Sequence, residues 1–248
     1  MSQIMNITAA DFEIAGPLAL PDDEVQLWRV DLEAVRINES RWLKLLSTDE
    51  SARASRFHFP RDRQSFAASR AILRMILAGY LAADPGALSF SYSDKGKPSL
   101  GPAYAVSRLQ FNVTHSGAIA MLAFTRQREI GVDVEQVRRD FEVEALAHRY
   151  FSACEQAQLA ALPADERVDA FFRCWTRKEA YIKATGDGLS LPLSQFDVSL
   201  EIEEANALLA TRPNESEASR WLLQDVPATP GYIAALCVRG QDWKLKSG

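Results

Sequence analysis

The spacing of apolar residues along the chain switches between the period of a strand and the period of a helix. Alternation predicts a strand at residues 25–32, and an apolar stripe at helical spacing predicts a helix from Pro60 to Leu81. Pro60 suits the first turn of that helix because its missing N–H group needs no partner there. The other elements predicted in this part of the chain are a helix at 41–57 and strands at 88–93, at 109–124 (two strands joined near Ser116 and Gly117) and at 128–137.

Helical patterns dominate the stretch from Glu142 to Thr185. Ser152, followed three residues later by Glu155, is a capping-box pattern. Gly186 is placed to end the last of these helices in a left-handed conformation. Alternating stretches then predict strands at 194–200, near Trp221 and at 232–238.

The order of strand, helices and strands therefore occurs twice, on either side of about residue 125. This order predicts an α+β protein with two similar α/β halves, each a small, mostly antiparallel sheet packed with helices. We expect the halves at 21–125 and 126–248, and a loose N-terminal extension at 1–20.

Composition narrows the class of protein. The chain has 248 residues, 47% apolar and 25% charged, which is typical of a soluble globular protein. Its net charge of −5 disfavours nucleic-acid binding, and no apolar run reaches the ~18 residues of a membrane span. The start of the chain does not resemble a signal peptide. Three widely spaced cysteines favour a reducing cytoplasm, and no CxxC or HExxH motif predicts a zinc site.

The stretch "GVDVE" carries two acidic residues, Asp133 and Glu135, two positions apart on a predicted strand. Side chains two apart point the same way, so these carboxylates lie about 7 Å apart on the face opposite Val132 and Val134. A magnesium ion would relieve their repulsion. The alternative is an ordinary half-buried strand whose outer face is wet.

The helix in "FFRCWTRKEAYIKATGDG" raises a similar question. At about 100° per residue, Glu179 falls within the stripe formed by the aromatic residues and Ile182. Arg173, Arg177 and Tyr181 fall on the other side. Glu179 is either a metal ligand or general base with Lys183 beside a phosphate, or it makes an ordinary i,i+4 ion pair with Lys183.

Basic residues gather between Ser51 and Arg74, where there are six arginines and one acidic residue. They form either a solvated helix face or a phosphate site, because arginine binds phosphate through two parallel hydrogen bonds. Lys95 and Lys97, in a Gly/Pro loop, extend the second alternative. His115, at a strand end in "FNVTHSG", is either structural or a phosphate or proton ligand.

Four motifs stand in a fixed order: "KGKP", "FNVTHSG", "GVDVE" and "WTRKEAYIKATGDGLSLPL". In that order and spacing the sequence resembles the 4′-phosphopantetheinyl transferases of the surfactin-synthetase-activating type, over about Arg53 to Val198. Thr114 stands where that family more often has serine, and the hydroxyl is retained. The resemblance implies two α/β halves in a pseudo-twofold arrangement around a cleft that the aromatic side of the last helix faces.

The resemblance also implies roles for individual residues. The implied metal ligands are Asp133, Glu135 and Glu179, with magnesium as the cofactor. The implied catalytic residues are Glu179, Lys183 and His115. The implied coenzyme A ligands are Arg53, Lys95, Lys97, Asn112, Thr114, His115, Asp133 and Lys183.

The implied reaction is the transfer of 4′-phosphopantetheine from coenzyme A to a serine of an apo acyl or peptidyl carrier protein, with release of 3′,5′-ADP. Two alternatives stay open: a non-catalytic module that binds coenzyme A or a carrier protein, and a magnesium-dependent hydrolase of coenzyme A or a nucleotide. Because one chain supplies both halves, we expect a monomer, without a nucleic-acid or membrane partner.

Overall fold

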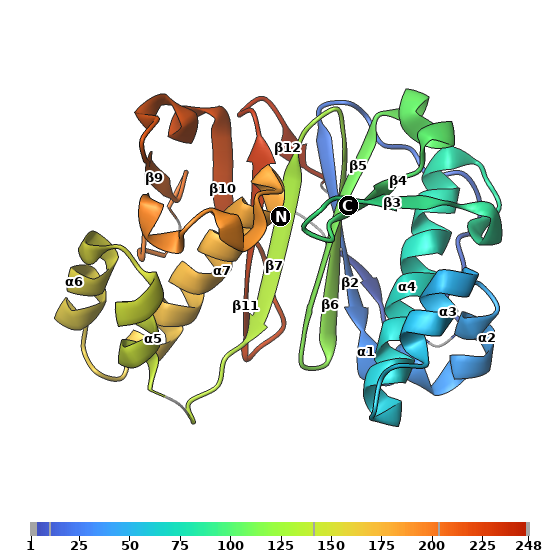
Figure 1. The fold of residues 1–248 in the computed structure, drawn as a ribbon, viewed down its shortest axis with the longest axis horizontal. Coiled ribbons are helices and arrows are strands. Elements are labelled where there is room, and N and C mark those ends of the chain that lie inside the picture. The colour runs from blue at the N-terminus through green and yellow to red at the C-terminus, as the bar shows by residue number, and fades with distance from the viewer. Residues whose placement is uncertain (1–3, 10, 141, 203, 247–248) are drawn as a thin grey trace.

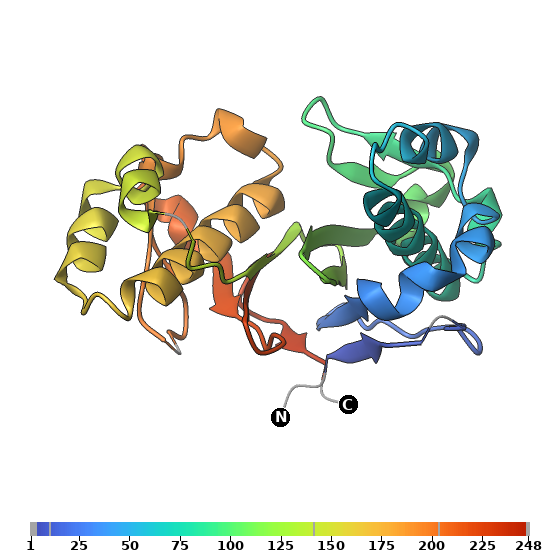
Figure 2. The same cartoon turned by 90° about the horizontal axis from the view of Figure 1, so that it is seen from below.

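Two sheets occupy the middle of the molecule, and helices cover their outer faces (Figure 1). The computed structural model describes residues 4–9, 11–140, 142–202 and 204–246. The sheets meet where β5 (Leu109–Ser116) runs beside β7 (Ile130–Gln136), and from below the helical layers lie to either side of the strands (Figure 2). The predicted mixed α+β class is confirmed.

The first sheet has the strand order β1–β2–β6–β5, and β12 also pairs with β2. The pairs β2–β6 and β6–β5 are antiparallel, whereas β1 and β12 run parallel to β2. Its remaining strands are β1 (Met5–Ile7), β2 (Glu24–Asp31), β6 (Ile119–Arg126) and β12 (Lys244–Leu245). The helices of this half are α1 (Leu32–Val35), α2 (Glu39–Leu43), α3 (Thr48–Ala54) and α4 (Pro60–Leu81).

The second sheet has the antiparallel order β10–β11–β7 and packs against α7. Two short antiparallel pairs, β3–β4 and β8–β9, stand apart from the main sheets. The bounds are β3 (Phe90–Tyr92), β4 (Pro98–Leu100), β8 (Phe196–Val198), β9 (Leu208–Thr211), β10 (Trp221–Asp225), β11 (Tyr232–Arg239), α5 (Val143–Tyr150), α6 (Ala153–Ala161) and α7 (Arg167–Thr185).

Three apolar clusters hold these layers together. One lies between α4 and the first sheet, and a second surrounds α7. The third lies between the sheets, where Ile130, Val132 and Val134 of β7 meet Leu27 and Met121 of the first sheet. The predicted apolar face of β7 therefore joins the two sheets, which leaves its opposite face to α7.

Local signals in the sequence are confirmed at several element ends. α4 spans Pro60–Leu81 as predicted, with Pro60 in its first turn. Ser152 and Glu155 form both hydrogen bonds of a capping box at the start of α6. Gly186 ends α7 with a φ of 79°, a conformation that glycine adopts without strain.

Two expectations for the first half are wrong. The N-terminal segment is not loose at residues 4–9 and 11–20, because β1 pairs with β2, the Phe12 ring packs on Trp28, and Leu18 N donates to the carbonyl oxygen of Gly79 at 2.9 Å; residues 1–3 and 10 lie outside the described part. The helix predicted at 41–57 is two helices, because the Ser47–Glu50 capping box starts α3 anew.

The proposed division at residue 125 stays a prediction. The two sheets are built mainly from the two parts of the chain, but β12, near the C-terminus, returns to the first sheet. Within the described residues, no helix is both long and apolar enough to cross a membrane.

Candidate active site

Helix α7 packs directly on strand β7 at Gly131. A Cβ atom there would lie 2.1 Å from the carbonyl oxygen of Ala180 and 2.3 Å from the amide nitrogen of Ala184. No side chain fits at these distances, so the helix comes this close only because residue 131 is glycine. The close approach brings the acidic face of β7 against α7.

Asp133 is the centre of the polar contacts between these elements. It is 2% exposed, and its Oδ1 accepts hydrogen bonds from Lys183 Nζ at 2.5 Å and from Thr114 Oγ1 at 3.0 Å. Lys183 Nζ also donates to Thr114 Oγ1 at 3.1 Å. Three elements (β5, β7 and α7) therefore converge on one carboxylate.

The second oxygen of Asp133 is different. Among the described residues, Oδ2 of Asp133 is a buried side-chain oxygen that makes no hydrogen bond of standard geometry, although the Val134 N–H group also acts on this carboxyl group. Burial raises the pKa of Asp133, and the Lys183 ammonium and the Thr114 hydroxyl offset this only in part. A buried carboxylate oxygen without a partner is costly, so this position favours a cation or a donor that completes it.

Glu135 and Glu179 lie near Asp133. Glu135 accepts a hydrogen bond from Ser116 Oγ at 2.7 Å, and burial and the charge of Asp133 raise its pKa. Burial and the same charge of Asp133 raise the pKa of Glu179 on α7. Three carboxyl groups from two elements thus oppose one another's ionisation, a pattern that clusters at functional sites.

The carboxylates suit a hard divalent cation such as magnesium by their chemistry. As the side chains stand, however, no three acidic, histidine or cysteine side chains of the described residues are grouped closely enough to hold a metal ion. Asp133 Oδ1 instead accepts a hydrogen bond from Lys183 Nζ. The unpartnered Oδ2 and the repulsion between the carboxylates fit a divalent cation by their chemistry, although the described residues do not present an assembled set of ligands.

Strand β5 contacts β7 through every second side chain. Asn112 Oδ1 accepts a hydrogen bond from Val132 N at 3.0 Å, Thr114 contacts Asp133, and Ser116 contacts Glu135. The predicted coenzyme A ligands Asn112 and Thr114 therefore join the two sheets in this structure. Ser116 was missed, although the alternation in "FNVTHSG" places it on the same face.

His115 lies on the opposite face of β5. The His115 side chain is exposed, but partial desolvation by the neighbouring protein and the positive charge of Lys183 still lower its pKa. The ring is therefore neutral near pH 7, so it can accept a proton or donate one hydrogen bond, but it supplies no fixed positive charge.

The "KGKP" loop between β3 and β4 reaches the end of α7. A pocket of about 250 Å³ is lined by this loop and by Asn112, Glu179, Lys183 and Gly188. Lys95 is exposed there and lies beside Gly188. Lys97 donates instead to three backbone carbonyls, those of Ile130, Lys183 and Ala184, so its ammonium has no donor left for the nucleotide expected there.

The six arginines between Ser51 and Arg74 do not form one cluster but make different contacts. Arg53 and Arg56 line a different hollow, next to Tyr92, and the Arg53 guanidinium lies over the Phe66 ring. The other four (Arg61, Arg63, Arg70 and Arg74) bind Glu33, Glu39 or Glu50 in ion pairs. A phosphate site formed by all six is therefore wrong, because four of them neutralise acidic residues of the same half.

The Glu50 ion pairs predict a pH-dependent stability. Burial raises the pKa of Glu50, but the Ser47 N–H group, Arg74 and Arg70 outweigh it, so the pKa lies below 4.5. The stabilisation is thus fully present above about pH 4.5, the pKa of an unfolded glutamate, and is lost as the pH falls through the lower folded-state value. We expect Glu50→Gln to lower the free energy of unfolding by about 2 kcal/mol at pH 7. Urea unfolding at pH 7 and pH 4 checks this, and a pH-independent difference would contradict it.

The aromatic stripe of α7 does not face a cleft, contrary to expectation. Phe171 stacks on Phe151, and Trp175 packs edge-on against Tyr150, in the core of the second half. The helix is buried on several sides: Arg177 on the supposed outer side is 0% exposed and binds Asp225. Only the C-terminal part of α7, from Glu179, lines the pocket near the "KGKP" loop.

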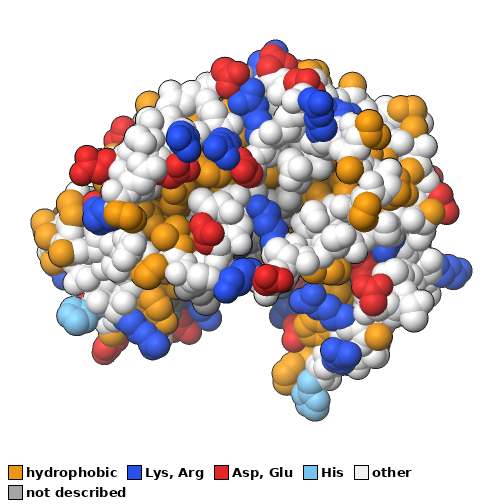
Figure 3. Space-filling view, turned by 45° about the horizontal axis from the view of Figure 1, so that its top comes forward, with side chains coloured by type: hydrophobic (Ala, Val, Ile, Leu, Met, Phe, Trp, Pro, Cys, Tyr) orange, Lys and Arg blue, Asp and Glu red, His pale blue; other side chains and the backbone are white. Residues whose placement is uncertain are grey.

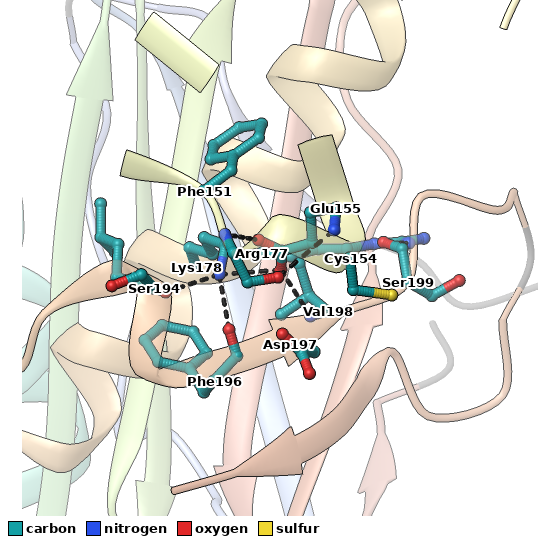
Figure 4. A network of polar contacts seen from close by, with 12 residues as sticks. Phe151, Cys154, Glu155, Arg177, Lys178, Ser194, Phe196, Asp197, Val198 and Ser199 are labelled. Atoms are coloured by element: carbon teal, nitrogen blue, oxygen red, sulfur yellow. Dashed lines mark hydrogen bonds and ion pairs between the residues drawn. The ribbon is translucent and has the colours of Figure 1, made fainter. Parts of the chain in front are cut away.

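Lys178, the neighbour of Glu179, has a structural role that sequence analysis missed. Its buried ammonium binds Glu155 Oε1 at 2.8 Å and donates to the carbonyl oxygens of Leu193 and Phe196, each at 2.7 Å (Figure 4). Glu155 is also the capping residue of α6 and accepts from Val198 N at 2.8 Å. The capping box was the available signal, but nothing in it indicates the lysine.

The surface between the two halves is notched, and acidic and basic side chains stand on the rim of the notch (Figure 3).

Comparison with known proteins identifies the family. The model described as the 4′-phosphopantetheinyl transferase superfamily matches residues 129–237, and the model of the N-terminal part of 4′-phosphopantetheinyl transferases matches residues 35–127.

Three relatives that carry the name 4′-phosphopantetheinyl transferase match most of the chain. The 4′-phosphopantetheinyl transferase HetI of Nostoc is 42% identical over 92% of this chain and 93% of its own length. A putative 4′-phosphopantetheinyl transferase of Synechocystis is 36% identical over 74% and 72%. The 4′-phosphopantetheinyl transferase Sfp of Bacillus subtilis is 29% identical over 82% and 86%. The chain therefore belongs to the 4′-phosphopantetheinyl transferase family of enzymes.

Proposed function

We propose that the protein transfers 4′-phosphopantetheine from coenzyme A to a serine hydroxyl of an apo acyl or peptidyl carrier protein, with magnesium, and releases 3′,5′-ADP. The observation that supports this most is the Asp133 site, where a buried carboxylate with one unpartnered oxygen lies between Lys183 and Thr114, close to two further acids. The names of the relatives supply the transferred group.

In this proposal Asp133, Glu135 and Glu179 hold the magnesium ion. When bound, magnesium stabilises negative charge on a diphosphate and on the leaving 3′,5′-ADP. Lys183 then contacts diphosphate oxygens, and Lys95 contacts the nucleotide end. Arg53 is proposed to reach the nucleotide from the separate hollow that it lines with Arg56 and Tyr92. Carboxylates alone do not distinguish magnesium from manganese.

Glu179 is the proposed general base. Its place in the pocket beside Lys183 allows it to accept the proton of the carrier serine, directly or through a bound water. The serine oxygen forms a bond to the β-phosphorus of coenzyme A, and the bond from that phosphorus to the 3′,5′-ADP oxygen breaks. His115, on the opposite face of β5, is proposed to contact the nucleotide end of coenzyme A, as the family resemblance implies, and Thr114 holds Asp133 and Lys183 in place.

The resemblance to the surfactin-synthetase-activating type, a monomeric state and a cytoplasmic location belong to the same proposal. A non-catalytic binding module is disfavoured, because binding alone gives no reason for three acids that oppose one another's ionisation. A hydrolase of coenzyme A would use the same acids, but it would need no carrier.

The test is the mass of an apo carrier protein incubated with the enzyme, coenzyme A and magnesium. We expect a gain of about 340 Da on one serine, and none when that serine is alanine. An unchanged carrier mass with several apo carriers would contradict transfer. Free phosphopantetheine formed without a carrier would instead identify the hydrolase.

A further inference from the structure

The ammonium group of Lys97 binds the protein itself. Nζ of Lys97 lies 2.5 Å from the carbonyl oxygen of Lys183, 3.2 Å from that of Ala184 and 3.3 Å from that of Ile130. An ammonium group has three hydrogens to donate, and here three acceptors surround it. Lys97 is also less exposed than Lys95 in the same loop.

The three carbonyls belong to the two elements that carry the acidic site. Two of them are in the last turn of α7, where carbonyl groups lack a partner within the helix and the helix dipole is negative. The third is the first residue of β7. A lysine of the first half thus supplies a positive charge and hydrogen bonds where α7 and β7 of the second half come together.

These contacts lie close to the side chains of Lys183 and Asp133. Lys183, whose carbonyl binds Lys97, is the residue whose side chain binds Asp133. At Gly131, next to Ile130, the backbone of α7 already lies in contact with β7. A small movement of the last turn of α7 therefore changes the distance between Lys183 and Asp133.

We propose that Lys97 is a positioning residue: through the carbonyls of Ile130, Lys183 and Ala184 it fixes the end of α7 on β7, and so places Lys183 and Glu179 against Asp133. The inference rests on the proposed function for its kinetic consequence only. It replaces the expectation that Lys97 binds the nucleotide.

The experiment compares Lys97→Met with Lys95→Met, a change of the same chemistry two residues away. For Lys97→Met we expect kcat to fall about a hundredfold while the KM for coenzyme A changes less than about threefold, because misplaced catalytic groups slow the reaction. For Lys95→Met we expect the reverse: a KM raised about tenfold with kcat retained.

Amide hydrogen exchange of the ligand-free proteins gives a readout that does not depend on activity. In Lys97→Met we expect exchange in the peptide 180–187 to become about tenfold faster, because the helix end loses its partner, while a peptide of α4 is unchanged. Lys95→Met should leave both peptides unchanged. Should Lys97→Met not fold, Lys97→Gln, which keeps an amide donor, allows the same comparison.

Three results would overturn the inference. One is a raised KM with unchanged kcat and unchanged exchange in Lys97→Met, which would identify Lys97 as a coenzyme A ligand. Another is faster exchange with unchanged kcat, which would make the contact only structural. The third is no change in either quantity. If the wild-type enzyme modifies no carrier, the proposed function has failed, and the exchange rates alone decide whether Lys97 holds the helix end.

Discussion

Replacing Asp133 by asparagine is expected to lower kcat for carrier modification by about a thousandfold or more, with the fold intact. Asparagine has the shape of aspartate, and its oxygen can still accept hydrogen bonds from Lys183 and Thr114. The change removes a buried negative charge, but it also takes the counterion from Lys183 and places an NH2 group at the unpartnered Oδ2 position, so the free energy of unfolding should fall by about 1–3 kcal/mol. Turnover by mass spectrometry and urea unfolding measure the two effects.

The matched control is Asp242→Asn. Asp242 is an exposed aspartate that binds Arg128, far along the chain from the site. This variant should keep wild-type turnover. Turnover of Asp133→Asn within threefold of wild type would refute the proposed centre, whereas loss of turnover with unfolding would make Asp133 a structural residue.

The environment of Asp133 links stability and function. Burial raises the pKa of Asp133, Glu135 and Glu179, and the charge of Asp133 raises the pKa of the two glutamates further. The fold offsets this cost with Lys183, Thr114 and Ser116, which come from elements on both sides of the site. The site therefore lies where β5 of the first sheet and β7 of the second sheet run side by side. Its geometry depends on the close approach of α7 at Gly131 and, in our proposal, on the contacts of Lys97.

Local signals in the sequence were sufficient for much of the fold. The bounds of α4, the cap of α6 and the end of α7 follow from interactions within a few residues, which the sequence displays directly. The parallel pairing of β1 with β2 and the return of β12 to the first sheet depend on contacts between distant segments, so no local pattern indicates them.

The site residues also divide into those that a local sequence pattern predicts and those that only long-range contacts reveal. The alternation of "GVDVE" and the helical spacing of Glu179 and Lys183 indicated which acids and bases share a face. The sequence did not indicate that Lys97 binds carbonyls 33, 86 and 87 residues away. A lysine in a loop has the same local pattern whether its ammonium binds a phosphate or a helix end.

Replacing Lys178 by methionine is expected to destabilise the protein by about 3–5 kcal/mol, the largest stability effect we predict. Lys178 and Glu155 are 0% and 1% exposed, so the change leaves a buried carboxylate without its counterion. It also removes the donor that holds the Leu193 and Phe196 carbonyls (Figure 4). Urea unfolding followed by tryptophan fluorescence measures the loss.

Arg239→Met provides the comparison. Arg239 also binds a glutamate, Glu129, but the side chains are 44% and 48% exposed, so solvent screens the pair and its loss should leave the free energy of unfolding nearly unchanged. If Lys178→Met costs no more than Arg239→Met, the buried pair does not hold α7 to α6. The double variant Lys178→Met with Glu155→Gln should recover part of the loss, because it removes the unpaired charge, although the single glutamine oxygen keeps only one of the two hydrogen bonds from Ser152 N and Val198 N.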